Sequence, residues 1–188
     1  RLARAVDPLK AAKRDAILAD LMSWATTVIK LPCDSVEVIS RLSKDITQFP
    51  GEFLIFSSHV QALSLEDRVA KLSREIHLEH MDGSTILTVD GKKSRWKLFS
   101  TNFRPPEEAR KDAGELADRE ELPVMWAVPM EGRAAAGQFW AFFPTEYKTT
   151  LNGIVNAPWK TNEDRQNLLK GDFNCAILDC VANLVVDN

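Results

Sequence analysis

The sequence predicts an α+β fold with a mainly antiparallel sheet. Amphipathic helical patterns lie toward both ends of the chain, and apolar and polar residues alternate with a period of two between residues 71 and 103. Two Asp-Gly pairs, a strong signal for tight hairpin turns, interrupt that alternating stretch. A strand-rich middle between helical ends is typical of α+β proteins.

The bulk composition is that of an ordinary globular protein, with 188 residues, 45% hydrophobic and 27% charged. This length suggests one domain or a fused pair. The formal net charge of −3 gives no general electrostatic reason to bind nucleic acid or an anionic membrane. No apolar run approaches the roughly 20 residues that a membrane span needs. The chain opens with Arg1 instead of Met, as a fragment or a processed chain would.

The first part of the chain predicts a helix, a strand and a second helix. The first helix covers residues 7–22, with Asp7 as its N-cap and Pro8 at its first position. Residues 24–31 are rich in β-branched side chains and predict a strand. The second helix covers residues 35–48, and its predicted buried stripe comprises Val38, Ile39, Leu42 and Ile46.

The middle of the chain predicts a meander. The apolar run 53–56 predicts a strand that is buried on both faces, with 60–65 as its neighbour. Three antiparallel strands follow within residues 71–103, joined by turns at Asp82-Gly83 and Asp90-Gly91.

The last part of the chain predicts a charged connection, two strands and two helices. The mixed charges of residues 104–121 indicate a solvated helix–loop segment. The strands cover 124–129 and 138–143, with a loop between them. One helix is predicted to start at Thr161 or Asn162, and an apolar helix covers 173–186.

The candidate site lies where two of these strands lead into the helix predicted at residue 161. Arg165 falls in the first turn of that helix, and Lys160 directly precedes it. A helix N-terminus with an arginine suits an anion, and a phosphate above all. The alternative is that Glu163 and Asp164 complement the helix dipole while Arg165 pairs with a surface carboxylate.

Three segments of this region carry a resemblance. FFPT (142–145), LNGIVNAPW (151–159) and NEDRQNLL (162–169) are similar to the segment that follows the ATP-binding domain of GHKL-type ATPases, in particular the sacsin-like and bacterial relatives of the ninety-kilodalton heat-shock chaperones. TTVIKLP (26–32) resembles the last strand of the GHKL domain, and residues 51–67 resemble the strand pair after it. The Glu/Asn helix, the DxGxG loop and the GxxGxG lid of that family are absent from the sequence.

The resemblance implies the end of an α/β-sandwich ATPase domain in residues 1–68 and a transducer-like α/β domain in 69–188. It implies a segment of an ATP-binding, chaperone-like ATPase in which Arg165 acts catalytically by sensing the γ-phosphate. Lys160, Asn162 and Asn167 would be its neighbours at the nucleotide, while ATP and Mg would be held mainly by residues outside this chain. A protein client is implied, and a homodimer is left open.

The alternative function is a non-catalytic α+β module that binds a protein partner through an edge strand or through residues 104–121. Three widely spaced cysteines, Cys33, Cys175 and Cys180, indicate reduced thiols of a cytoplasmic protein. Cys175 and Cys180 are expected to be small core residues.

Other candidate sites are weaker. His77 and His80 fall on opposite faces of a predicted strand, so no metal site is expected from them. Trp159 lies before the predicted helix and is expected to shape the Arg165 site. Asn156 is expected to be a strand residue whose side chain satisfies the backbone of a loop.

Overall fold

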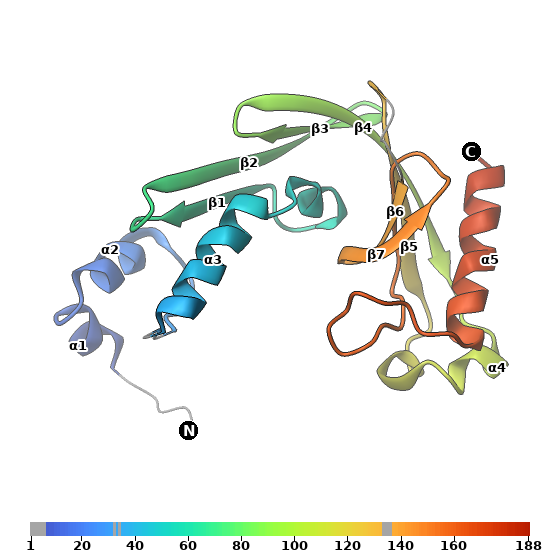
Figure 1. Ribbon diagram of the computed structural model, residues 1–188, viewed down its shortest axis with the longest axis horizontal. Helices are drawn as coiled ribbons and strands as arrows, with labels where there is room; N and C mark the ends of the chain where they lie inside the picture. The colour runs from blue at the N-terminus through green and yellow to red at the C-terminus, as the bar shows by residue number, and fades with distance from the viewer. Residues whose placement is uncertain (1–6, 32, 34, 133–136) are drawn as a thin grey trace. The chain divides into compact units, whose positions relative to one another are not determined.

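The computed structural model describes residues 7–31, 33, 35–132 and 137–188, and it confirms the predicted α+β class (Figure 1). The chain divides into two compact units, 1–44 and 45–188. The boundary predicted after residue 68 falls instead inside the hairpin of strands β1 (Ala62–Asp67) and β2 (Leu72–Met81). Because these strands share one hydrogen-bonded ladder, they belong to the same unit.

The first unit contains two short helices and most of a third: α1 (Pro8–Ala12), α2 (Ala16–Trp24) and α3 (Val36–Gln48). Asp7 caps the first helix as predicted, with Pro8 following it. The predicted single helix over 7–22 is wrong, because Asp15 caps a second helix by accepting the N–H of Leu18 at 3.1 Å. A short polar side chain that bonds the backbone in this way favours a new helix start over continuation.

The apolar residues of the first unit are uncovered. The strand predicted over 24–31 is wrong, since Trp24 ends α2 and residues 25–31 form no strand. The predicted stripe of α3 is also not buried: Val38, Ile39 and Leu42 are 48%, 39% and 50% exposed. Among residues 7–31, 33 and 35–44, none is buried. Packing therefore contributes little to the stability of this unit by itself.

This lack of burial predicts where a protease will act first. We expect limited trypsin digestion to cut after Lys13 or Arg14, between α1 and α2, before it cuts within 104–121, because segments with few buried contacts open at the lowest free energy. Mass spectrometry of the early fragments measures this order. First cuts at Arg110 or Lys111 would contradict the packing described below for that segment.

The second unit is built on an eight-stranded sheet in the order β1-β2-β3-β4-β5-β8-β6-β7. All pairings are antiparallel except that of β6 with β8. The meander β2–β3–β4 is confirmed, with turns at Asp82-Gly83 and at Asp90-Gly91. The remaining strands are β3 (Ser84–Val89), β4 (Lys92–Phe103), β5 (Leu122–Pro129), β6 (Gly137–Ala141), β7 (Phe143–Thr149) and β8 (Ile154–Asn156).

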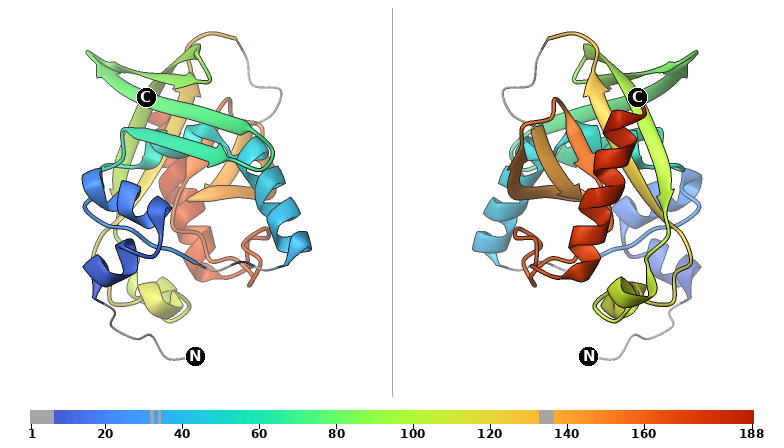
Figure 2. Two further views of the ribbon diagram at one scale, coloured as in Figure 1. Left: turned by 90° about the vertical axis from the view of Figure 1, so that its left-hand side faces the viewer. Right: turned by 90° about the vertical axis from the view of Figure 1, so that its right-hand side faces the viewer.

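The middle of the sheet is covered on both faces. Successive side chains of β5 and β8 alternate between two cores: Val124 and Val155 belong to one, Ala127 and Ile154 to the other. Helix α5 (Asp172–Val186), predicted correctly, packs against β4 and β5 on the first face (Figures 1 and 2). Phe173, Ile177, Val181 and Leu184 of this helix are buried there.

The second face carries a short 3-10 helix, η1 (Gly51–Phe56), where the sequence predicted a strand. The prediction of burial was correct, since Leu54, Ile55 and Phe56 are 0–5% exposed. The type of element was wrong, because a short apolar run is compatible with either a buried strand or a buried helical turn. Gly51 is needed here, since a Cβ would lie 2.5 Å from Cγ2 of Val89.

The charged segment 104–121 folds into a short helix, α4 (Glu107–Arg110), and a 3-10 turn, η2 (Gly114–Leu116). Ala109 and Ala113 are each 2% exposed, in the same core as α5. The segment is therefore packed, whereas the sequence predicted a solvated connection.

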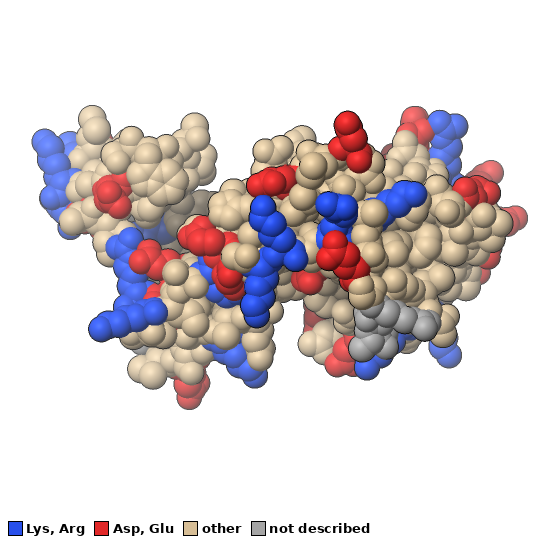
Figure 3. Space-filling view, turned by 90° about the horizontal axis from the view of Figure 1, so that it is seen from above, with Lys and Arg blue, Asp and Glu red and all other residues tan. Residues whose placement is uncertain are grey.

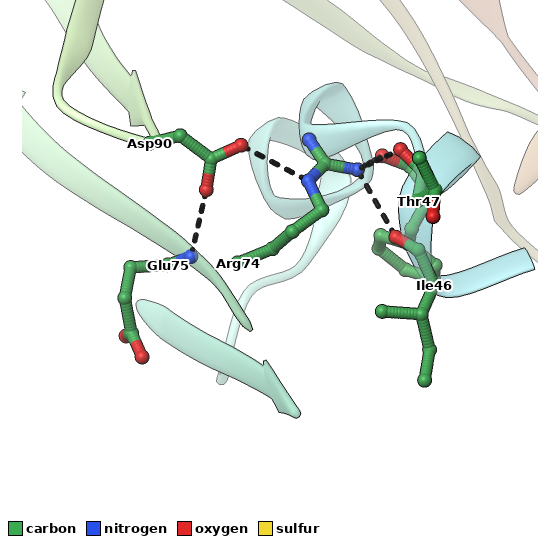
Figure 4. Close-up of polar contacts among 6 residues, drawn as sticks. Ile46, Thr47, Arg74, Glu75 and Asp90 are labelled. Atoms are coloured by element: carbon green, nitrogen blue, oxygen red, sulfur yellow. Dashed lines mark hydrogen bonds and ion pairs between the residues drawn. The ribbon is translucent and has the colours of Figure 1, made fainter. Parts of the chain in front are cut away.

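Arg74 of β2 joins three parts of the second unit (Figure 4). Its Nη1 donates to the carbonyl oxygens of Ile46, Thr47 and Phe49 at 3.3, 3.0 and 2.7 Å, at the end of α3. Its Nε donates to Asp90 Oδ2 at 3.0 Å. The last carbonyls of a helix lack intrahelical partners, so a partly buried guanidinium that bonds them stabilises the helix end.

Lysine and arginine side chains are interspersed with aspartate and glutamate on the face that Figure 3 shows, so that this face presents mixed charge. Among the described residues, no helix is both long and apolar enough to span a membrane.

Candidate functional site

The FFPT segment begins at the turn between β6 and β7, where Phe142 has a positive φ of 69°, and it continues as the start of β7. This conformation is rare for an aromatic residue and needs support from neighbouring groups. Asn156 at the end of β8 supplies it, since its Oδ1 accepts the backbone N–H of Phe142 at 2.8 Å. Asn156 is 7% exposed. The prediction that it satisfies the backbone of a loop is confirmed.

Residues 157–171 form an ordered loop, and the helix predicted to start at Thr161 or Asn162 is absent. Thr161 bridges Leu168 in antiparallel fashion, and the N–H of Asn162 donates to the carbonyl of Asn167 at 3.0 Å. The loop therefore folds back on itself, with Arg165 near its tip at a φ of 59°.

Short polar side chains explain why this segment turns instead of continuing as a helix. Asn162 Oδ1 accepts the N–H of Asn167 at 3.0 Å, and Asp164 Oδ1 accepts that of Gln166 at 2.9 Å. Side chains that bond nearby backbone groups compete with helical hydrogen bonds. The helix dipole invoked for the phosphate site is consequently not available at Arg165.

A buried asparagine of α5 anchors both ends of this loop. Asn174 is 6% exposed, its Oδ1 accepts the N–H of Lys160 at 2.9 Å, and its Nδ2 donates to the carbonyls of Lys160 and Leu169 at 2.9 and 2.7 Å. The sequence analysis missed this residue. In the sequence, Asn174 is visible as a single amide side chain on the apolar face of a predicted helix, beside Phe173 and Ile177.

Lys160 ties the loop to the segment 104–121. Its Nζ donates to Asp112 Oδ1 at 2.7 Å and also bonds the carbonyl of Asp112. The hydrogen bond from Lys160 lowers the pKa of the Asp112 carboxyl below its ordinary value. The Asp112 carboxylate packs directly against Gly171, where a Cβ would lie 2.0 Å from Asp112 Oδ2. Lys160 is thus engaged in a structural ion pair.

A cavity of about 450 Å³ lies where these segments meet. Its apolar walls include Phe56, Met125, Phe142 and Trp159, and Asn156, Glu115 and Arg165 add polar groups. Within the described part of the chain, the guanidinium of Arg165 makes no hydrogen bond or ion pair. Of the buried side-chain nitrogens and oxygens described, only Nε1 of Trp159 has no hydrogen-bond partner.

The four residues predicted at the nucleotide lie in one loop, but their side chains are engaged differently. Arg165 borders the cavity, whereas the backbone and side chain of Asn162 hold the loop together with the backbone of Asn167. Trp159 is 5% exposed and lines the same cavity, in agreement with its expected role in shaping the site. The sequence analysis did not find Glu115, which lies far from the loop in sequence.

The remaining candidates stay apart from this cavity. His77 is exposed and alternates with the buried neighbours Ile76 and Leu78 on β2, so that it lies on the face opposite His80, as predicted. Residues that could jointly hold a metal ion do not cluster in the described ranges. The three cysteines are free thiols; Cys175 is exposed, contrary to the expected core position, and burial raises the pKa of the Cys180 thiol.

Comparison of the chain with protein-family models, with curated proteins and with solved structures finds no match.

Proposed function

We propose that this chain is a segment of an ATP-binding, chaperone-like ATPase of the GHKL type that couples nucleotide hydrolysis to domain movement. One observation carries the proposal: the three segments that resemble GHKL-type ATPases contribute residues to one cavity. These segments are 142–145, 151–159 and 162–169. Phe142, Asn156, Trp159 and Arg165 come from these segments and share that cavity. Segments that carry a shared function are expected to meet in space.

The uncovered first unit supports the same proposal. Its apolar side chains, among them Trp24 and Leu31 at 73% and 81% exposed, are not buried within the unit itself. Exposed apolar surface of this extent marks a contact with another chain or domain. We propose that the rest of an ATPase domain covers it and binds ATP and Mg.

Arg165 is the residue that we propose to contact the γ-phosphate in the closed state. Its guanidinium is unpaired within the described residues and sits near the tip of an anchored loop. An arginine supplied from a second domain stabilises charge on the transferring phosphoryl group. The proposed compartment is the cytoplasm, which suits three free thiols.

Turnover of the longer ATPase tests this role. We expect Arg165→Ala to reduce ATP hydrolysis by about 100-fold or more, and Arg165→Lys to restore it only in part, because a point charge lacks the two-pronged guanidinium fork. Arg119→Ala, which removes another exposed arginine, should leave turnover unchanged. An unaltered turnover number in Arg165→Ala would refute the role. The 188-residue chain alone should show no ATP hydrolysis above buffer in a phosphate-release assay.

A second candidate is a non-catalytic module that binds a protein partner. It is favoured by the position of β1 at the end of the sheet, where one edge of Ala62–Asp67 has no strand partner among those described. An extended peptide can add to such an edge. The coding sequence before residue 1 discriminates the two functions: the ATPase proposal requires an Asn-bearing helix and a DxGxG loop there, and their absence would favour the interaction module.

A further inference from the structure

We propose that the cavity beside Arg165 binds a carboxylate that is attached to an aromatic or aliphatic group. The volume of about 450 Å³ falls within the usual range for small-ligand sites. Phe56, Met125 and Phe142 give the cavity an apolar interior that suits a ring or an alkyl chain. The walls come from β5, η1, the β6–β7 turn and the loop after β8, all within the second unit.

The polar groups of the cavity are mainly hydrogen-bond donors. The indole nitrogen of Trp159 can only donate, and it is buried without an acceptor among the described residues. This nitrogen has essentially no accessible surface, so Trp159 contributes ring carbons, and not its N–H, to the cavity wall. Asn156 supplies a donor: its Oδ1 is fixed by the N–H of Phe142, which leaves its Nδ2 unbonded within the described residues.

Arg165 supplies the charge that selects a carboxylate. Its guanidinium borders the cavity and makes no ion pair within the described part of the chain. The planar guanidinium fork matches the two oxygens of a carboxylate and forms charge-assisted hydrogen bonds with them. A ligand with an apolar body and one carboxylate therefore suits the guanidinium, the amide group of Asn156 and the aromatic walls together.

Among the described residues that line the cavity, Glu115 alone carries a carboxylate, and it opposes an anionic ligand. A like charge at short range disfavours the bound anion, so removal of the Glu115 charge should strengthen binding. Removal of the Arg165 charge should thus weaken binding of the carboxylate ligand, and removal of the Glu115 charge should strengthen it. A nonspecific apolar contact would not show these opposite effects.

This inference does not rest on the proposed ATPase function. It uses the geometry of the second unit alone, and its test contains no nucleotide. Failure of carboxylate binding would leave the ATPase proposal standing, and an ATPase that is insensitive to Arg165→Ala would leave the carboxylate site standing.

Isothermal titration calorimetry of the 188-residue chain with 3-phenylpropionate provides the test. We expect saturable binding, with 3-phenylpropionamide at least about 10-fold weaker because it lacks the charge that Arg165 pairs with. Inorganic phosphate should also bind at least about 10-fold more weakly, because it has no apolar body. Absence of saturable binding by 3-phenylpropionate, or equal binding of its amide, would overturn the proposal.

Two peptide probes identify the source of the carboxylate. An N-acetylated tetrapeptide that ends in phenylalanine is compared with the same peptide amidated at its C-terminus. Stronger binding of the free-acid peptide than of 3-phenylpropionate supports a peptide C-terminus as the natural ligand. Binding of 3-phenylpropionate alone supports a small free acid in the same site.

Substitutions at the cavity complete the test. We expect Arg165→Gln to weaken 3-phenylpropionate binding by about 10-fold, and Glu115→Gln to tighten it. Lys148→Gln removes an exposed charge of β7 and should leave binding unchanged. Arg165 and Glu115 are both exposed, so their variants should fold normally. Binding that is unaffected by both Arg165→Gln and Glu115→Gln would overturn the proposal.

Discussion

Replacement of Asn174 by alanine is expected to lower the free energy of unfolding by about 3 kcal/mol, because it leaves buried backbone groups without partners. Three hydrogen bonds are lost, and two of the partners freed are backbone groups of Lys160. The third partner is the carbonyl of Leu169, at the other end of the loop that carries Arg165. Urea denaturation followed by circular dichroism measures the change.

Asn183 provides the matched control on the same helix. It is an asparagine of α5 whose side chain is exposed and makes no described hydrogen bond, so Asn183→Ala should change the free energy of unfolding by less than about 0.5 kcal/mol. Asn174→Asp keeps an acceptor for the N–H of Lys160 but loses both donors, and it should destabilise nearly as much as alanine. Equal stability of Asn174→Ala and Asn183→Ala would contradict the anchoring role.

Replacement of Arg74 by alanine is expected to lower the free energy of unfolding by about 3 kcal/mol, since the carbonyls at the end of α3 lose a charged donor. The guanidinium side chain is 14% exposed, so water replaces these bonds poorly. Arg74→Lys should recover only part of the loss, because one ammonium cannot reach the three carbonyls of residues 46, 47 and 49 while also bonding Asp90. Arg95→Ala, at an exposed position of β4, is the matched control. A loss no larger than that of Arg95→Ala would contradict this account.

The Asp90 carboxylate is expected to make the free energy of unfolding depend on pH. The backbone N–H of Glu75 and then the side chain of Arg74 lower the pKa of Asp90 below its ordinary value. A carboxyl with a lowered pKa in the folded state stabilises the protein above its unfolded pKa, and this contribution is lost as the pH falls through the folded pKa. Asp90→Asn should therefore be less stable than the wild type at neutral pH, with the difference shrinking in acid. A difference that does not change between neutral and acid pH would contradict this linkage.

The meander and α5 were predictable because their signals are local. The Asp-Gly pairs at 82–83 and 90–91 define hairpin turns by themselves. The alternation of apolar and polar residues along β2 indicates which side chains lie on each face of the sheet. The apolar pattern of 173–186 likewise reports a helix packed on a core. Such features need no information from distant parts of the chain.

The secondary-structure predictions are wrong where contacts distant in sequence, or local side-chain hydrogen bonds, determine the structure. The loop at 161–168 has charged residues typical of a helix start, but Asn162 bonds across the loop and Asn174 holds its ends from a later helix. The strand predicted at 24–31 lacks a partner strand among the described residues, and β-propensity alone does not form one.

The candidate site was predictable in part. Arg165 and Trp159 were identified from their place at a predicted helix start, which the structure replaces with a loop, and Asn156 was identified as a strand residue that satisfies the backbone of a loop. The cavity itself could not be predicted, because Glu115 and Phe56 reach it from segments that are remote in sequence.

The indole resonance of Trp159 tests the central claim, that the loop of Arg165 and the β6–β7 turn border a cavity that binds a carboxylate ligand. Among the other tryptophans, Trp96, Trp126 and Trp140 donate to Ser94, Asn152 and Gln138, and Trp24 is exposed. In a ¹H–¹⁵N correlation spectrum with 3-phenylpropionate added, the account predicts a shift of the Trp159 indole resonance, assigned by its loss in Trp159→Phe, while the other indole resonances stay in place. An unmoved Trp159 resonance at saturating ligand would contradict it.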